Sequence, residues 1–305
     1  MRSTIIAEPW ANKSTNGRSQ SDTWDWRRLG FQLLGFIAPE LAQERALERF
    51  LTPPAPLLNH AKSPKLDGIS SDRFKVKMST RSGGAHETTE LDVQLWGRGP
   101  AVYLLHGWGG RSTQWSSFVA PLVQAGLTAV VFDAPGHGES PAPRTSIPHF
   151  AAALTAVVES VGPARAIVGH SLGGVASSVA LGRGLVAERV AFIAAPADPT
   201  EFFLGYLKQI GLPGHLLDRI WTKFEREYGF DWRELPVRAP HRAAGMPALV
   251  VHDQGDREVP YASADRIVRS WPDATLVTTT GLGHYRILRD ASVIERVVAF
   301  AAGRA

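Results

Sequence analysis

The sequence predicts an α/β fold in which a mostly parallel sheet of eight strands carries helices on both faces. Apolar runs of strand length alternate with longer helix-like segments from about residue 101 onward, which is typical of strands joined by helical crossovers. Each run is followed by polar or glycine-rich residues, and functional side chains gather at the carboxyl ends of such strands. With 305 residues, 44% of them hydrophobic, the chain has room for one such domain with an insertion.

Composition excludes several classes of function. The net charge is only +4 and the basic residues are scattered, so we expect no nucleic-acid partner. The chain has no cysteine and therefore no disulfide, thiolate metal site or cysteine nucleophile. The apolar run at the N-terminus is too short for a secretory signal, and no stretch has the length of a membrane span. We therefore expect a soluble, cytoplasmic protein.

Residues 1–72 are expected to form an N-terminal extension. Residues 11–23 are almost wholly polar and predict a loose tail. From 29 to 51 apolar residues recur at helical spacing, with Pro39 marking a break or the start of a second helix. This segment predicts a helical lead-in packed on the main body. The alternative is a surface helix that contacts a membrane or a partner.

The main domain is expected to span residues 73–305 and to open with an antiparallel hairpin. Residues 74–78 and 91–96 alternate between apolar and polar, with turn residues at 82–84 between them. The remaining strands are expected at 101–105, 127–132, 164–168, 190–194, 247–251 and 274–279, and helices at 118–124, 147–161, 172–181 and 292–301.

Residues from about 200 to 243 interrupt this alternation with a helical, aromatic-rich insertion. In a functional interpretation its aromatic side chains roof an apolar pocket, and Phe202, Phe203 and Tyr206, together with Trp108, contact the substrate. In the other interpretation these side chains pack the insertion against the body of the protein. Both interpretations can hold for different residues.

Ser171 stands in a pattern that predicts an exposed nucleophile. Residues 167–174 read as an apolar strand, a sharp turn and a helix start, with Gly169 and Gly173 two places on either side of the serine. A nucleophile on such a turn has a strained backbone, and glycines remove the collisions that bulkier neighbours would cause. The helix that follows aims free N–H groups and its positive dipole end at an oxyanion formed there.

A second glycine-rich segment, residues 106–110, follows the first buried strand. Its glycines let the backbone approach a ligand closely, so the Trp108 N–H is a candidate oxyanion donor beside the Leu172 N–H. A simple glycine-rich turn with a buried tryptophan would explain the same residues.

Candidate partners of the serine follow two later strands. A serine hydroxyl needs a neutral imidazole to take its proton, and the imidazole needs a carboxylate to fix its tautomer. His284 follows the last strand, and Asp256 follows the strand before it. Asp253 is a second candidate acid, but Asp256 is favoured by its position before Val259. The order serine, aspartate, histidine is the one associated with the α/β-hydrolase arrangement.

With these residues the chain resembles the α/β-hydrolase family over about residues 73–302. The resemblance is carried by the segments His106-Gly107-Trp108-Gly109, Asp133-Ala134-Pro135-Gly136-His137-Gly138-Glu139-Ser140, Gly169-His170-Ser171-Leu172-Gly173-Gly174, Asp256-x-x-Val259-Pro260 and Gly283-His284. It is closest to small intracellular esterases, lipases and related acyl hydrolases with a short helical cap.

The resemblance implies an α/β-hydrolase fold and a role for each matched position. Ser171 would be the nucleophile, Asp256 the acid, His284 the base, and Trp108 and Leu172 the donors of the oxyanion amides. Two features depart from the family. Asp253 stands where glycine is common, and the N-terminal extension exceeds what a minimal member needs.

Other polar residues in the motifs are expected to hold turns. His106, His137 and His170 are assigned structural hydrogen bonds rather than proton transfer, and none has a second histidine at metal-ligand spacing. Asp133 is expected to brace its glycine-rich loop. We therefore expect no metal site.

The sequence thus predicts hydrolysis of a carboxylic ester without a cofactor, and the expected substrate is a small-molecule ester with an apolar group. Serine at the elbow argues against epoxide hydrolases and haloalkane dehalogenases of this fold, which use a carboxylate nucleophile. Alternatives are other reactions of the same triad, namely carbon–carbon, thioester or amide hydrolysis and perhydrolysis. A non-catalytic ligand-binding protein on a hydrolase scaffold is a further alternative.

Overall fold

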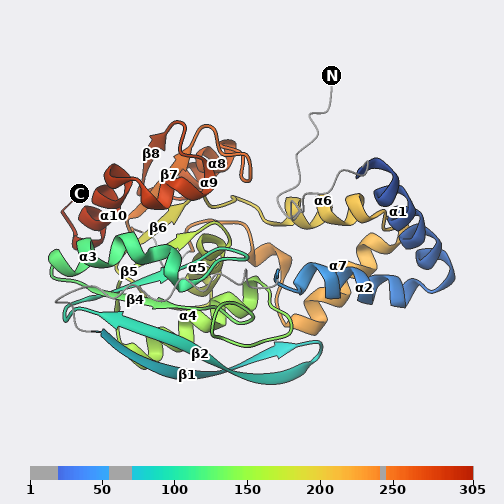
Figure 1. The fold of residues 1–305 in the computed structure, drawn as a ribbon, viewed down its shortest axis with the longest axis horizontal. Coiled ribbons are helices and arrows are strands. Elements are labelled where there is room, and N and C mark those ends of the chain that lie inside the picture. The colour runs from blue at the N-terminus through green and yellow to red at the C-terminus, as the bar shows by residue number, and fades with distance from the viewer. Residues whose placement is uncertain (1–19, 55–70, 241–244, 305) are drawn as a thin grey trace.

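The computed structural model describes residues 20–54, 71–240 and 245–304, and its centre is a sheet of eight strands (Figure 1). The spatial order is β1-β2-β4-β3-β5-β6-β7-β8. The strands from β4 to β8 pair in parallel, whereas β1, β2 and β4 pair antiparallel. The predicted α/β-hydrolase fold is therefore confirmed. The strands are β1 (Ser71–Ser82), β2 (Ala85–Trp96), β3 (Ala101–Leu105), β4 (Thr128–Phe132), β5 (Ala164–His170), β6 (Val190–Ile193), β7 (Ala248–Asp253) and β8 (Ala274–Thr279).

The hairpin of β1 and β2 is closed by a two-residue turn. Ser82 pairs with Ala85, and the intervening Gly83 and Gly84 have φ angles of 58° and 87°. Two-residue hairpin turns favour positive φ at both central positions, which only glycine adopts at little cost. The predicted hairpin is confirmed, and both strands are longer than the alternating residues alone indicate.

Helices cover both faces of the sheet because its central strands are apolar on both sides. On β3, Tyr103 and Leu105 belong to the core shared with α4, α5 and α8, whereas Val102 and Leu104 face the core shared with α3 and α10. The helices on the first face are α4 (Ile147–Val161), α5 (Leu172–Gly182) and α8 (Ala262–Ser270); those on the second are α3 (Ser116–Gln124) and α10 (Ala291–Ala302). Short turns of helix are Ser112–Trp115, Gly214–Leu216, Trp232–Glu234, α9 (Gly283–Arg286) and Ile287–Arg289.

Four helices lie together at one end of the molecule, at the right of Figure 1. They are α1 (Gln20–Ile37), α2 (Pro39–Leu51), α6 (Thr200–Ile210) and α7 (Leu217–Tyr228). Two segments distant in sequence, the N-terminal extension and the insertion near residue 200, are therefore packed together. α2 buries Ala42, Ala46 and Leu47 in the core that it shares with α6 and α7.

The second N-terminal helix begins where Pro39 predicts, whereas the first begins earlier than the spacing of its apolar residues predicts. α2 begins at Pro39, where the missing N–H of proline costs no helical hydrogen bond. α1 begins at Gln20, so the prediction of a loose tail is wrong for residues 20–23, and residues 11–19 lie outside the described part of the chain. Polar residues suit the first turn of a helix because its N–H groups need acceptors.

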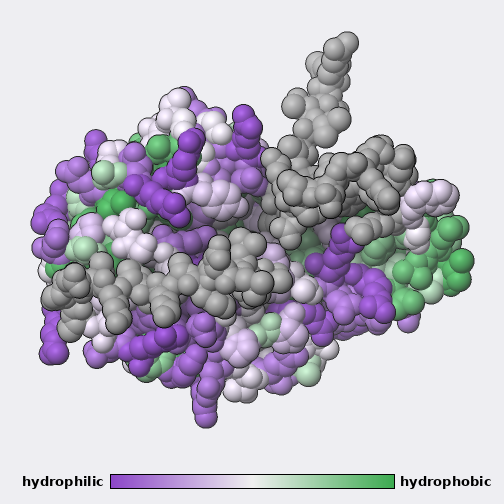
Figure 2. All heavy atoms as spheres, in the orientation of Figure 1, coloured by the Kyte–Doolittle hydropathy of each residue, from purple (hydrophilic) through white to green (hydrophobic). Residues whose placement is uncertain are grey.

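One side of α1 packs on the insertion and the other is apolar and exposed. A Cβ at Gly35 would come within 2.5 Å of Pro213, so the two segments are in close contact there. Trp26, Phe36 and Ile37 are 75%, 72% and 81% exposed, although the Phe36 ring also lies 5.3 Å from that of His215, and apolar residues gather at this end in Figure 2. No helix in the described residues is long and apolar enough to cross a membrane. Contact of this helix with a membrane surface stays a prediction.

Candidate active site

Ser171 occupies a strained turn between β5 and α5. Its φ is 52°, and Ala194 is the only other non-glycine residue of the described chain with a positive φ. The turn is tight, because a Cβ at Gly169 would lie 2.5 Å from the backbone of Gly174, and one at Gly173 would lie 2.3 Å from the carbonyl oxygen of Leu105. Such a backbone conformation costs about 1–3 kcal/mol in a non-glycine residue. The surrounding contacts hold Ser171 at the end of the sheet where ligands of parallel sheets bind.

The loop after β3 runs directly beside this serine. A Cβ at Gly107 would be 2.9 Å from the Ser171 Cβ, so only glycine fits there. Trp108 follows, with its ring edge-on to His137 at 5.7 Å. On the other side Leu172 begins α5, and the first N–H groups of a helix have no partner within the helix. Of the two residues expected to supply oxyanion amides, Leu172 therefore follows the serine in sequence, and Trp108 follows the glycine that lies against the serine in space. Their role stays a prediction.

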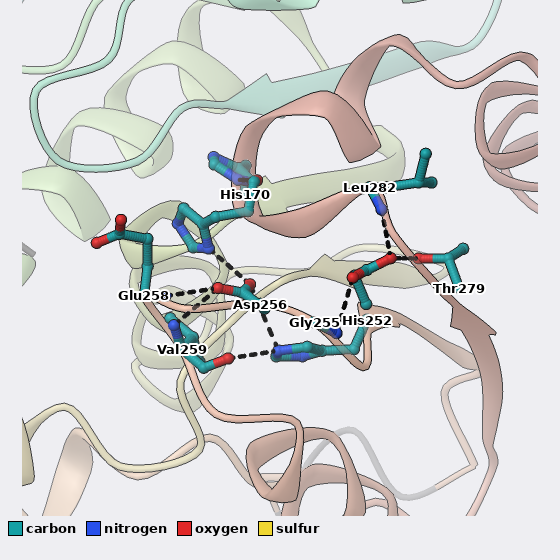
Figure 3. Close-up of polar contacts among 10 residues, drawn as sticks. His170, His252, Gly255, Asp256, Glu258, Val259, Thr279 and Leu282 are labelled. Atoms are coloured by element: carbon teal, nitrogen blue, oxygen red, sulfur yellow. Dashed lines mark hydrogen bonds and ion pairs between the residues drawn. The ribbon is translucent and has the colours of Figure 1, made fainter. Parts of the chain in front are cut away.

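A buried aspartate contacts the histidine that follows β8. His284 Nδ1 lies 2.8 Å from Asp256 Oδ2 (Figure 3). The Asp256 side chain is 0% exposed and that of His284 is 6% exposed. The second oxygen, Oδ1, accepts the backbone N–H groups of Glu258 at 2.8 Å and Val259 at 2.9 Å. Both oxygens of the carboxylate are thus directed by hydrogen bonds.

The electrostatics of Asp256 fix the tautomer of the imidazole. Burial by itself raises the pKa of Asp256, but the hydrogen bond and charge of His284 and the two backbone donors outweigh it and leave the pKa below its usual value. The carboxylate is therefore ionised at neutral pH and only accepts hydrogen bonds. Nδ1 of His284 must carry the proton of this hydrogen bond, which leaves Nε2 as the basic nitrogen.

Asp253, the other candidate acid, is also buried but has a different set of partners. Its Oδ1 accepts the Gly255 N–H at 2.9 Å, and its Oδ2 accepts the Thr279 hydroxyl at 2.8 Å and the Leu282 N–H at 2.9 Å. These bonds join the end of β7 to the end of β8 and to the loop that carries His284 (Figure 3). The carboxylate that contacts His284 is that of Asp256.

The serine and the histidine loop are joined through His170. His170 Nε2 donates to the carbonyl oxygen of His284 at 2.9 Å, and the two rings are 4.8 Å apart. Burial lowers the pKa of His170 to about 3, so its ring is neutral. In the described residues no hydrogen bond joins the Ser171 hydroxyl to His284. Such bonds are often long in free enzymes and shorten when substrate is bound.

Two further histidines hold turns, as the sequence predicts. His106 Nε2 accepts the Ala134 N–H at 3.0 Å, and its Nδ1 donates to the carbonyl of Gly107 at 2.7 Å. His137 Nδ1 donates to the carbonyl of Pro135 at 3.1 Å. Burial lowers the pKa of His106 to about 4 and that of His137 to about 3. Both rings are neutral and engaged with backbone.

Asp133 braces its loop in the predicted way. Its carboxylate accepts the Ser112 N–H at 2.6 Å and the Glu139 N–H at 2.9 Å. A Cβ at Gly138 would approach that carboxylate to 2.0 Å, so glycine is required where the loop folds over it. Among the described residues, no three histidine or acidic side chains are grouped as a metal site requires.

The aromatic residues of the insertion divide between two environments. Phe203 is 1% exposed and packs on Phe50 of α2, with ring centroids 4.6 Å apart. The Tyr206 hydroxyl donates to the carbonyl of Ala46 at 3.1 Å. Both side chains therefore contribute to packing the N-terminal extension on the insertion. Phe202 is partly exposed. Contact of these three residues with substrate stays a prediction.

Sequence reasoning gave no role to His252, although it stands next to the candidate acid in space. His252 ends the apolar part of β7 and is 0% exposed. Its Nε2 lies 3.0 Å from the carbonyl oxygen of Val259 and 3.6 Å from Asp256 Oδ2. A lone histidine at the end of a buried strand resembles a core residue, and a bond to a backbone carbonyl leaves no pattern in the sequence.

Comparison with known proteins identifies relatives along most of the chain. The family model described as "Alpha/beta hydrolase family" matches residues 102–297. A non-heme haloperoxidase of Rhodococcus erythropolis is 30% identical over 252 residues, covering 66% of this chain and 91% of that protein. A pimeloyl-[acyl-carrier protein] methyl ester esterase of Methylococcus capsulatus is 45% identical over 51 residues, which cover 17% of this chain and 20% of the esterase.

Solved structures share the fold at low sequence identity. A bromoperoxidase from Bacillus anthracis superposes with a TM-score of 0.56 at 18% identity, over 76% of this chain and all (100%) of that one. An esterase from Thermogutta terrifontis gives a TM-score of 0.54 at 18% identity, over 76% of this chain and 99% of the esterase. With the match of the family model to most of the domain, these findings establish that the chain belongs to the alpha/beta hydrolase family.

Proposed function

We propose that this member of the hydrolase family cleaves a carboxylic ester through an acyl-enzyme formed on Ser171. The observation that carries the proposal is the buried hydrogen bond between Asp256 and His284, whose imidazole packs against the residue next to the strained serine. A serine, an imidazole and an oriented carboxylate in this order are the parts that nucleophilic acyl transfer requires.

In the proposed reaction His284 acts first as a base and then as an acid. Its Nε2 takes the proton of the Ser171 hydroxyl while the oxygen attacks the ester carbonyl, and the tetrahedral oxyanion accepts the N–H groups of Trp108 and Leu172. The intermediate collapses as His284 returns the proton to the leaving alcohol. A water molecule, deprotonated by the same nitrogen, then attacks the acyl-enzyme and releases the acid.

The surroundings of His284 favour an uncharged substrate with an apolar group. The Tyr285 ring stands edge-on to the His284 ring at 4.9 Å and is 55% exposed. The Glu258 carboxylate is partly buried and interacts electrostatically with His284, and burial raises the pKa of this carboxyl group. An anionic substrate would meet this acidic group. In this proposal α6 and α7 serve as a short helical cap of the domain.

A series of 4-nitrophenyl esters from acetate to palmitate tests the proposal. The wild-type protein should release nitrophenol, and the chain length at the maximum of kcat/KM should report the depth of the acyl pocket. Ser171→Ala should abolish turnover and leave the fold intact, because a small partly exposed hydroxyl contributes little to the core. Wild-type activity in this variant would contradict the assignment of the nucleophile.

A second candidate, perhydrolysis, is favoured by two relatives. Besides the haloperoxidase, a non-heme chloroperoxidase of Burkholderia pyrrocinia is 26% identical over 265 residues, covering 68% of this chain and 94% of that protein. Here hydrogen peroxide replaces water: its oxygen attacks the acyl-enzyme, the proton passes to the serine through His284, and a peracid leaves. Bromination of monochlorodimedone in acetate, peroxide and bromide, lost in Ser171→Ala, would support this reaction.

A further inference from the structure

His252 lies against the acid of the proposed site and is wholly buried there. One oxygen, Asp256 Oδ2, lies 2.8 Å from Nδ1 of His284 and 3.6 Å from Nε2 of His252. The same Nε2 lies 3.0 Å from the carbonyl oxygen of Val259. Figure 3 shows the His252 ring pointing at Val259 and Asp256 from the end of β7. The aspartate is therefore approached by two imidazoles.

The tautomer of His252 follows from its partners. A carbonyl oxygen only accepts hydrogen bonds, so Nε2 of His252 must carry a proton and donate it to Val259. The other nitrogen, Nδ1, has no hydrogen-bond partner among the described residues. A second proton there would be buried without an acceptor, and burial accordingly lowers the pKa of His252 despite the nearby carboxylate. The ring is neutral, with its N–H directed at the acid loop.

This N–H completes a chain of bonds that ends at His284. His252 holds the carbonyl of Val259, the N–H of Val259 donates to Asp256 Oδ1 at 2.9 Å, and Asp256 Oδ2 accepts from His284. The segment between Asp256 and Val259 is a tight turn whose orientation decides which way the carboxylate points. An apolar side chain at position 252 would fill the same space without leaving a buried Nδ1 unsatisfied, so packing alone does not account for histidine here.

We propose that His252 is a positioning residue, whose Nε2–H fixes the Val259 carbonyl and so keeps Asp256 directed at His284. This proposal rests on the proposed function, because the hydrogen bond that His252 maintains is the one that sets the tautomer of the catalytic base. His252 touches no substrate in this account. Its contribution passes entirely through the turn that carries the acid.

Three substitutions distinguish the effect of the Nε2–H donor of His252 from the effect of its side-chain packing. The amide nitrogen of glutamine lies close to where Nε2 of histidine lies, so His252→Gln keeps the donor. The amide of asparagine lies nearer to Nδ1 and is too short to reach Val259, so His252→Asn keeps polarity without the bond. His252→Met keeps the volume and removes the donor. If the methionine variant does not fold, the matched pair of glutamine and asparagine decides.

Two measurements are made on each variant. With 4-nitrophenyl esters, His252→Gln should stay within about threefold of the wild-type kcat, whereas His252→Asn and His252→Met should lose about tenfold or more with little change in KM. In proton NMR spectra, the downfield resonance of the His284 Nδ1–H, assigned by its loss in His284→Gln, should persist in the glutamine variant. In the other two variants it should broaden or move upfield.

Retention of the wild-type kcat and resonance in His252→Met and His252→Asn would overturn the proposal. Equal losses of kcat in all three variants would also overturn the proposal, because the loss would then not depend on the hydrogen-bond donor at position 252. If the wild-type protein hydrolyses no ester, the proposed function fails, but the NMR comparison does not require turnover. The positioning role of His252 is then judged by that resonance alone.

Discussion

At the scale of single residues, two aspartates three positions apart have different hydrogen-bond partners near the ends of two strands. Asp253 accepts hydrogen bonds from Thr279 and Leu282 and joins strand ends, whereas Asp256 contacts His284. The sequence spacing between Asp256 and Val259 favours Asp256 as the acid, but only the structure shows which hydrogen bonds its carboxylate accepts. His252 was missed because its partner is a backbone carbonyl.

Replacing each aspartate by asparagine should separate these roles. Asp256→Asn should lower kcat by about four orders of magnitude, because the amide no longer enforces the required tautomer of His284. Asp253→Asn should lower kcat far less but reduce the free energy of unfolding, since its amide NH₂ cannot accept all three bonds. Both are measured by ester kinetics and urea unfolding. If Asp253→Asn is the more damaging change to kcat, Asp256 is not the acid.

At the scale of elements, the turn between β5 and α5 depends on glycine, because there is no space for a Cβ atom at Gly173. The strand, the turn and the helix are all predictable from sequence, because their apolar runs and glycine spacing are local. The close approach of Gly173 to the Leu105 carbonyl is not local and appears only in the structure. The aromatic residues of α6 show the same limit, since Phe203 contacts Phe50, which is far away in the sequence.

Two glycines of α5 form a matched pair for testing this turn. Gly173→Ala should destabilise the protein by about 1–3 kcal/mol or more, because its Cβ would lie 2.3 Å from a backbone oxygen. Gly182→Ala, in the same helix, meets nothing within 4 Å and should be neutral or slightly stabilising. Urea unfolding at neutral pH measures both. Equal stabilities of the two variants would contradict the packing described at the elbow.

At the scale of the whole molecule, the core buries several histidines in the neutral form. Burial lowers the pKa to about 4 for His106 and His149 and to about 3 for His137 and His170. The parallel sheet and its covering helices could be predicted from the alternation of apolar segments. The burial of these rings could not, because histidine is compatible with both core and surface.

The buried histidines should make stability depend on pH. Unfolded histidines titrate at about 6.5 and these folded ones at lower pH, so between these values the unfolded chain binds more protons. Stability is therefore complete above pH 6.5 and is lost as pH falls toward the folded pKa values. We expect the free energy of unfolding to be about 2 kcal/mol or more lower at pH 5 than at pH 7.5.

Urea unfolding at a series of pH values measures this dependence, and His149→Gln provides a control outside the site. His149 bonds the Ser146 hydroxyl at 2.9 Å and contacts the Tyr228 ring, and neither contact involves Ser171, Asp256 or His284. Replacing His149 should remove the part of the pH dependence of the free energy of unfolding that one histidine contributes. A stability that does not change between pH 7.5 and pH 5 would contradict the neutral, buried state of these rings.

The central claim, that Ser171 carries the acyl group during ester cleavage, is tested most directly by mass spectrometry of the quenched reaction. The protein is mixed with 4-nitrophenyl butyrate, stopped in acid within the first turnovers and digested with protease. We expect a butyryl mass on the peptide that contains Ser171, absent from Ser171→Ala. Ester hydrolysis by the wild-type protein with the acyl group on another residue, or with activity unchanged in Ser171→Ala, would contradict it.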